Sequence, residues 1–153
     1  MPINMTMSSE FENQSVSGRR LFSILAKTVL VVDDHPGVCK VASLILKHFG
    51  CRVLTANNAE QAMRVARGNA KIDLLLTDLE MLGMPGDELA AWFRAVRPHT
   101  PVVFMSGNPI RLSRLQPCYL VTKPFVRLDA FVSTIREAIY HSNHAQSATP
   151  AAA

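Results

Sequence analysis

The chain has 153 residues, of which 48% are apolar and 18% charged, and its formal net charge is +4 at pH 7. This is enough apolar material for one globular domain with a core, but a second domain of useful size does not fit beside it. The basic residues are scattered and show no helix-turn-helix or zinc-finger spacing, so nucleic-acid binding is not supported. No stretch approaches the roughly 20 apolar residues of a membrane span, which argues against a membrane protein.

The cysteine content points to a reducing compartment. Cys39, Cys51 and Cys118 make an odd number and show no CxxC spacing. We interpret them as small buried side chains rather than as a disulfide framework or a zinc site. A cytoplasmic location is therefore expected.

The two ends of the chain lack the patterning of its middle. Residues 1–27 begin with an aperiodic stretch rich in Ser, Asn and Met, and we expect a mostly flexible tail in which Ile24 and its apolar neighbours could pack on the domain. Residues 141–153 are small, polar and uncharged, and are expected to be disordered. The folded domain is thus placed at residues 28–140.

Between these ends, short apolar runs alternate with helical patterns. The runs are typical of strands buried on both faces and cover residues 28–32, 51–56, 72–77, 101–105 and 119–122. Apolar residues recur at helical spacing in residues 36–49, 58–67, 85–96 and 126–140, and one or two helical turns are expected near residues 110–115. Gly50 and Gly68 are placed to end the first two helices, and Asn57 or Asn58 to cap the second.

The order of these elements predicts the fold. Strands that alternate with helices require right-handed crossovers, which place helices on both faces of one sheet. We therefore expect an α/β fold with a doubly wound, five-stranded parallel sheet of order 2-1-3-4-5, as in flavodoxin-like proteins. The residues expected to face the sheet from the first, third and last long helices are Val38, Val41, Ala42, Ile45, Leu46, Phe49, Leu89, Phe93, Val96, Leu128, Phe131, Val132, Ile135 and Ile139.

Carboxylates follow two strands of this predicted sheet. Asp33 and Asp34 come directly after the first apolar run, and Asp78 after the third. Ligands of open parallel sheets bind outside the carboxyl ends of the strands. Three carboxylates in one crevice repel one another, and a hard divalent cation with oxygen ligands relieves that repulsion, which points to Mg²⁺. Two alternatives remain open, namely Asp78 as a turn residue and the Asp pair as a cap for the helix that Pro36 begins.

Four segments together carry a family resemblance. They read VLVVDDHP, LLLTDLEM, VVFMSGN and LVTKPF, and they follow one another in this order. They resemble the receiver domain of bacterial response regulators, which has the CheY-like fold, and the resemblance covers residues 28–140. A single motif such as KPF would say little, but the full set of five polar positions is specific: Asp33, Asp34, Asp78, Ser106 and Lys123.

The resemblance implies phosphoryl transfer to a carboxylate. Asp78 would take a phosphoryl group from the phosphohistidine of a histidine kinase or a histidine phosphotransfer protein. Lys123 and Ser106 would contact that group, and the Lys123-Pro124 peptide bond would be cis. The protein would act as a switch of a two-component system or phosphorelay rather than as a turnover enzyme, and would signal by altered binding to an output partner protein.

The resemblance also implies a ligand set for Mg²⁺. Asp34 would bind it directly and Asp33 through water, together with Asp78 and the backbone carbonyl of Glu80. The Glu80 side chain stands where the family varies residues that tune the lifetime of the acyl phosphate, as does Asn108.

The chain departs from its family in the region that transmits the signal. Leu120 stands three residues before Lys123, where the family usually has an aromatic residue, and the neighbouring Tyr119 should face the opposite side of the sheet. The segment between Ser106 and Lys123 is also short. A further departure is Leu82, which replaces a common proline and is expected to matter little.

Three hypotheses follow from the sequence. The leading one is a single-domain receiver that is phosphorylated on Asp78. The alternative is a receiver-like protein-interaction module that acts independently of phosphorylation, because its aromatic switch residue is missing. An aspartate-nucleophile phosphohydrolase fits less well, because it needs an acid where the chain has His35 or Pro36. Three arginines could receive an acidic partner on the proposed output face: Arg111, Arg114 and Arg127.

Overall fold

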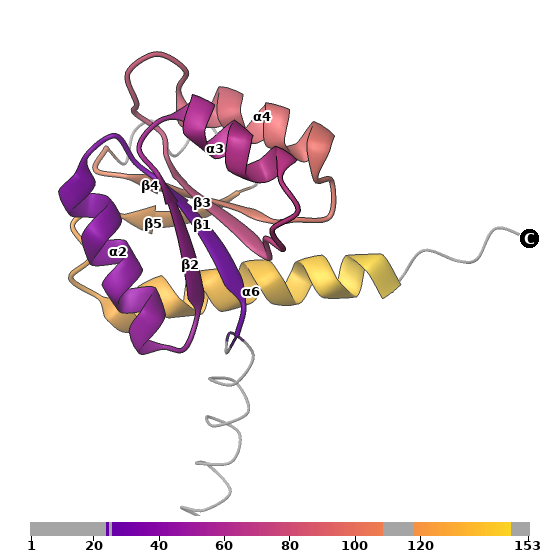
Figure 1. The fold of residues 1–153 in the computed structure, drawn as a ribbon. Helices are drawn as coiled ribbons and strands as arrows, with labels where there is room; N and C mark the ends of the chain where they lie inside the picture. The colour runs from indigo at the N-terminus through magenta and orange to yellow at the C-terminus, as the bar shows by residue number, and fades with distance from the viewer. Residues whose placement is uncertain (1–23, 25, 109–117, 148–153) are drawn as a thin grey trace, which may run out of the picture.

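The computed structural model describes residues 24, 26–108 and 118–147, and these form a three-layer α/β domain (Figure 1). Its parallel strands are β1 (Thr28–Val32), β2 (Arg52–Ala56), β3 (Leu74–Asp78), β4 (Val102–Ser106) and β5 (Tyr119–Thr122). Its helices are α2 (Pro36–His48), α3 (Ala59–Arg67), α4 (Gly86–Val96) and α6 (Leu128–Ser147). The sheet order is β2-β1-β3-β4-β5, which confirms the predicted topology.

The sheet is covered on both faces, as the continuous apolar runs predict. Helices α2 and α6 lie on one face and α3 and α4 on the other (Figure 1). Strand β1 shows why an uninterrupted run suits this position, since Val29 and Val31 pack toward α2 and α6 while Leu30 and Val32 pack toward α3 and α4. All four side chains are fully buried.

The predicted helix ends are confirmed. The side chain of Asn58 accepts a hydrogen bond of 2.8 Å from Gln61 N–H and so caps α3, which ends at Gly68. After α2, Gly50 has φ 84°, a left-handed conformation that glycine adopts without steric strain. The Lys123-Pro124 bond is cis, as the resemblance implied.

Three residues that were predicted to face the core are exposed. Val41, Val96 and Leu128 have exposed fractions of 48%, 44% and 46%. On α2 the buried stripe instead runs through Cys39, Ala42, Ser43 and Leu46, and a residue two positions from Cys39 lies on the opposite side of a helix. Val96 is the last residue of α4, and Leu128 is the first of α6.

The domain extends beyond both predicted boundaries. Helix α6 continues to Ser147, so the expectation of disorder from residue 141 is wrong for residues 141–147. The added helical turns are held by the neighbouring loop, because Ser142 Oγ donates a hydrogen bond of 2.7 Å to His99 O. At the other end, Ile24 is fully buried in the core cluster on the face of the sheet that α2 and α6 cover, and Ala26 N–H donates to Gly50 O at 2.9 Å. The rest of the predicted N-terminal tail lies outside the described residues.

Two other expectations also lie outside the described residues: the short helix near residues 110–115, and the contribution of Arg111 and Arg114 to an output face. Among the residues that are described, no helix is both long and apolar enough to span a membrane.

Candidate functional site

The carboxyl ends of the strands bring the predicted polar residues to one edge of the sheet. Asp78 is the last residue of β3 and pairs with Met105 of β4, the residue before Ser106. Ser106 in turn pairs with Thr122 of β5, the residue before Lys123. Asp33 directly follows β1, which lies beside β3. Parallel register thus gathers residues that are up to 90 positions apart in the chain.

Lys123 ties the two buried carboxylates together. Its Nζ atom lies 3.1 Å from Asp33 Oδ2 and 3.1 Å from Asp78 Oδ1. Asp33 is fully buried, Asp78 is 2% exposed and the Lys123 side chain is 19% exposed, so water screens these ion pairs only weakly. One ammonium group, at the end of β5, therefore neutralises part of the negative charge at the ends of β1 and β3.

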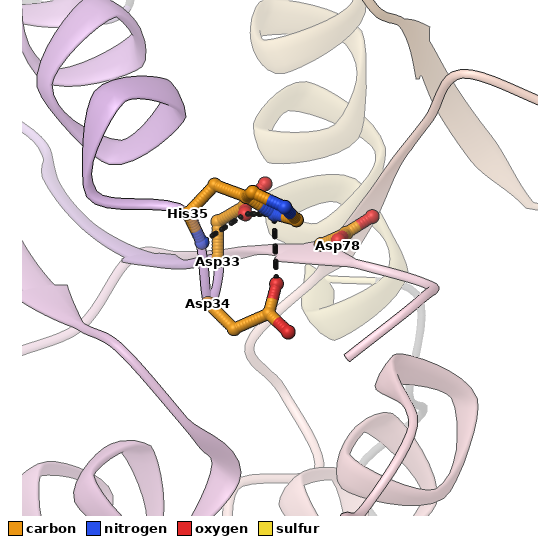
Figure 2. Close-up of side chains that lie close together, drawn as sticks. All are labelled: Asp33, Asp34, His35 and Asp78. Atoms are coloured by element: carbon orange, nitrogen blue, oxygen red, sulfur yellow. Dashed lines mark hydrogen bonds and ion pairs between the residues drawn. The ribbon is translucent and has the colours of Figure 1, made fainter. Parts of the chain in front are cut away.

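Asp34 and His35 complete the acidic cluster (Figure 2). Asp34 Oδ2 accepts a hydrogen bond of 3.1 Å from the backbone N–H of Leu82, which fixes the carboxylate against the loop after β3. His35 Nδ1 lies 3.0 Å from Asp34 Oδ1 and 3.3 Å from Asp33 Oδ1. The cluster is thus more than a helix cap, since His35 rather than an aspartate is the N-cap residue of α2 and makes no side-chain cap hydrogen bond.

Burial shifts the protonation equilibria of the cluster. It raises the pKa of Asp78 above its usual value, and the charge of Asp33 adds to this, while contacts with Lys123 and a backbone hydrogen bond from Glu80 oppose it. For Lys123, burial alone would lower the pKa, but the contacts with Asp33 and Asp78 outweigh burial and raise it. Lys123 is therefore held as a cation beside Asp78.

A glycine allows α4 to approach the Asp78 backbone. The N–H of Gly86, the first residue of α4, donates to Leu79 O at 3.0 Å. A Cβ atom on Gly86 would lie 1.9 Å from the backbone oxygen of Asp78. Only glycine fits this contact, which fixes the loop that follows β3.

Ser106 is fully buried at the end of β4. Its Oγ accepts a hydrogen bond of 2.9 Å from Asn108 N–H and lies 3.3 Å from Asn108 O. Ser106 and Asn108 therefore both lie at the carboxyl edge of the sheet. The Ser106 hydroxyl is hydrogen-bonded to the backbone of Asn108 in the loop that follows β4.

The oxygen-rich cluster fits a divalent cation. Within the described residues, Asp78 Oδ1 and Asp34 Oδ1 are buried oxygens with no hydrogen-bond donor, although Lys123 and His35 lie near them as cationic partners. Ligand atoms of Asp33, Asp34, His35 and Asp78 all lie within 4.8 Å of one another. Carboxylate oxygens are the ligands that Mg²⁺ prefers, so these residues have the composition of a magnesium site.

The sequence analysis missed two residues of this site. His35 was considered only in the DDHP segment and as a residue that does not fit the phosphohydrolase pattern, although its position directly after two carboxylates is visible in the sequence. Gly86 stands in the segment after Asp78, which the sequence predicts only to be a turn. No pattern in the sequence shows that α4 meets the Asp78 backbone, because that contact depends on how the helix packs.

The region around β5 shows how the chain differs from the family pattern. Leu120 is half-buried against the core under α3 and α4, whereas Tyr119 packs on the opposite face. The Tyr119 hydroxyl contacts His141 Nδ1 of α6, and the two rings are stacked with centroids 6.1 Å apart. The prediction that Tyr119 faces away from the Leu120 side is confirmed. Arg127 is exposed and pairs with Asp129 at 2.9 Å.

Known proteins resemble the chain in sequence. The family pattern described as "Response regulator receiver domain" matches residues 29–129. Transcriptional regulatory protein GlrR of Escherichia coli (strain K12) is 34% identical over 119 residues, which are 74% of this chain and 26% of GlrR. Autoinducer 1 sensor kinase/phosphatase LuxN of Vibrio campbellii is 36% identical over 81 residues, which are 53% of this chain and 9% of LuxN. The chain thus spans about a quarter of the first relative and less of the second.

Solved structures resemble it in fold. The receiver domain of the hybrid histidine kinase CckA has a TM-score of 0.63 and 29% identity, covering 73% of this chain and 98% of that chain. A receiver domain protein from Clostridium thermocellum has a TM-score of 0.68 and 22% identity, covering 78% and 98%, and this likeness supports the fold. The family pattern matches residues 29–129, which contain nearly the whole sheet, and the sheet has the predicted strand order. The chain therefore belongs to the response regulator receiver domain family of two-component systems.

Proposed function

We propose that the protein takes a phosphoryl group from phosphohistidine onto Asp78 and signals through altered binding to a partner protein. The supporting observation is the position of Lys123 Nζ, 3.1 Å from both Asp33 Oδ2 and Asp78 Oδ1. This arrangement presents a carboxylate beside a fixed cation at a sheet edge, which suits attack on a phosphoryl group. The protein would be a self-phosphorylating and self-dephosphorylating switch rather than a turnover enzyme.

The reaction would be an in-line displacement. An Asp78 carboxylate oxygen attacks the phosphorus, a P–O bond forms, and the P–N bond of the donor histidine breaks with its electron pair leaving on the imidazole. As negative charge develops on the phosphoryl group, the Lys123 ammonium can shift its contact from the Asp78 oxygen to a phosphoryl oxygen. Ser106 can donate its hydroxyl to another phosphoryl oxygen if it gives up its contact with Asn108 O.

The proposal assigns Mg²⁺ to the acidic cluster. Asp34, Asp78 and the Glu80 carbonyl would bind the ion directly, and Asp33 through water. When bound, Mg²⁺ supplies positive charge to the phosphoryl oxygens. Asp34 is already oriented for this by the backbone N–H of Leu82.

The donors would be histidine kinases or histidine phosphotransfer proteins. GlrR is named a transcriptional regulator, LuxN a sensor kinase/phosphatase and CckA a hybrid histidine kinase. Proteins of both the output and the kinase type thus contain regions similar to this chain. We infer that its donor carries a phosphohistidine and that its output is read by another protein.

Beryllofluoride, which imitates a phosphoryl group on aspartate, tests this proposal. With Mg²⁺ present, amide NMR signals of Lys123 and Ser106 should shift in the wild type and in Asp87→Asn, which changes an exposed carboxylate of α4. They should not shift in Asp78→Asn. Equal shifts in Asp78→Asn, or none in the wild type, would contradict the proposal.

A second function is favoured by Leu120. Leucine, not an aromatic residue, occupies the position of the family's aromatic switch residue. Tyr119 cannot replace it, because its hydroxyl contacts His141 on the other face of the sheet. The protein could then bind a partner independently of phosphorylation. Partner affinity that is equal with and without beryllofluoride, and equal in Asp78→Ala, would select this function.

A further inference from the structure

A cleft of about 470 Å³ lies at the amino edge of the sheet, opposite the carboxyl edge that carries the acidic cluster. It is lined by Val102 and Tyr119, the first residues of β4 and β5, whereas Ser106 is the last residue of β4 and Lys123 follows β5. Four steps along a strand span about 13 Å, so the cleft is separate from the proposed phosphorylation site. Its volume is typical of small-molecule sites, which measure about 300–1,000 Å³.

One wall of the cleft comes from the last turns of α6, which are yellow in Figure 1. Ser142 Oγ and Gln146 Nε2 both donate to His99 O, at 2.7 and 3.4 Å, and so hold this wall against the loop between α4 and β4. The family pattern matches residues 29–129, and Ser142 and Gln146 lie beyond that match. The wall that α6 supplies is therefore a feature of this chain and not of the family pattern.

The described lining of the cleft contains basic side chains and no carboxylate. The basic side chains are those of Arg94, on α4, and His99. In the described part of the chain, the arginines that form ion pairs are Arg64 and Arg127, so Arg94 has no carboxylate partner there. Its charge is felt inside the cleft, because burial raises the pKa of the Cys118 thiol and Arg94 opposes that rise. The cleft is therefore suited to an anion.

The remainder of the lining is more apolar than polar. Pro98 and Pro101 contribute flat rings from the loop between α4 and β4, and Ala145 of α6 is small enough to leave room beside them. The ring of Tyr119 is held by stacking on His141, with the centroids 6.1 Å apart. Aromatic rings pack well against such faces, and arginine forms charge-assisted hydrogen bonds with carboxylates. The lining thus matches a molecule that has both groups.

We propose that the cleft binds a small carboxylate with an aromatic body, which pairs its charge with Arg94 and packs its ring against Pro98 and Pro101. Exposed arginines without a partner are common on protein surfaces. Arg94 differs because it lines a cleft of ligand size in which no described carboxylate competes for it. The proposed site goes beyond the proposed function and does not require phosphorylation of Asp78.

NMR titration of the full chain with 3-phenylpropionate tests the inference. The matched control ligand is 3-phenylpropanamide, which has the same shape but no charge. We expect 3-phenylpropionate to bind with a Kd of about 1 mM or below. The largest shifts should fall on the backbone N–H signals of Val102, Tyr119 and Ala145. The neutral control should bind at least about tenfold more weakly, because it forms no ion pair with Arg94.

Two pairs of variants locate the site, and all four of the changed residues are exposed, so the fold should tolerate each change. Arg94→Gln should weaken binding of 3-phenylpropionate at least about tenfold, whereas Arg64→Gln, on α3, should change it less than about twofold. Ala145→Phe places a large side chain in the cleft and should weaken binding at least about fivefold. Ala95→Phe adds the same side chain to α4 outside the lining and should leave binding unchanged.

Four results would each overturn the inference. The first is a set of shifts that does not saturate by about 10 mM of 3-phenylpropionate, which would show binding without a specific site. The second is a set of shifts centred on Lys123 or Arg127, which would place the carboxylate on another cation. The third is equal affinity for the acid and its neutral amide. The fourth is an affinity in Arg94→Gln or Ala145→Phe that equals that of the wild type.

Discussion

Replacing Gly86 with alanine should damage both the stability of the domain and the proposed phosphorylation site. The added Cβ would lie 1.9 Å from Asp78 O, 2.8 Å from Asp78 C and 3.0 Å from Leu79 Cα. Real Cβ atoms essentially never come within 3.0 Å of such atoms, so helix and strand must separate by about 1.1 Å. All three contacts are with backbone, which cannot rotate away as a flexible side chain can.

The size of the effect follows from this displacement. Overpacking of a core typically costs 1–3 kcal/mol, and a clash with backbone lies at the upper end, so we expect Gly86→Ala to lower the free energy of unfolding by about 3 kcal/mol. The same shift moves Asp78 relative to Lys123, whose ion pair is only 3.1 Å long. Phosphorylation should therefore be slower even under conditions where the variant remains folded.

Gly37→Ala is the matched control. Gly37 lies in the first turn of α2, and a Cβ atom there would meet nothing within 4 Å. Alanine in a helix is favoured over glycine, so this variant should be as stable as the wild type or up to about 1 kcal/mol more stable. Urea unfolding measures both variants. A Gly86→Ala protein within about 0.5 kcal/mol of the wild type would refute the reasoning.

Three further predictions concern stability and protonation. Ser43 Oγ is buried without a hydrogen-bond partner in the described structure, so Ser43→Ala should raise the free energy of unfolding by about 1 kcal/mol in urea titrations; a loss of stability would contradict this. Arg97 donates hydrogen bonds of 2.9–3.1 Å to three carbonyls at and after the end of α3, so Arg97→Ala should lower the free energy of unfolding by about 2 kcal/mol. The control Arg94→Ala, which changes an exposed arginine of α4, should lower it by less than about 0.5 kcal/mol. The raised pKa of Asp78 means that the folded state binds its proton more tightly than the unfolded state does, so this group makes the protein less stable as pH rises above its usual value of 3.8. Without divalent cations, the stability advantage of Asp78→Asn should therefore be small at low pH and grow as pH rises through the raised pKa; an advantage that shrinks with rising pH would contradict the assignment.

Much of the fold could be predicted because buried parallel strands leave a simple signal. The run that became β1 is apolar from Val29 to Val32 because side chains on both faces are covered, and the order of elements leaves few topologies. Positions on helices were less predictable. Val41 is apolar and was expected in the buried stripe of α2, but α2 turns Cys39 and Ser43 inward instead, and this rotation is set by tertiary packing. Likewise, α6 continues past Tyr140 through polar contacts with His99 that no apolar pattern shows.

The candidate site was predictable to the extent that strand ends fix positions. Asp33, Asp78 and Lys123 lie together as expected, since each stands at the carboxyl end of a strand. The distances, the ion pairs of Lys123 and the raised pKa of Asp78 depend on burial, which the sequence does not report. Gly86 acts through the close approach of α4 to the end of β3, so its importance appears only once the chain is folded.

The most direct test of the central proposal is the intact mass of the protein after incubation with acetyl phosphate and Mg²⁺. One phosphoryl group should be added to the wild type and to Asp87→Asn. None should be added to Asp78→Asn, or to the wild type when the divalent cation is removed with a chelator. Undiminished labelling of Asp78→Asn would contradict the assignment of the phosphoacceptor. A wild type that is labelled neither by acetyl phosphate nor by a phosphorylated histidine donor would contradict phosphoryl transfer itself.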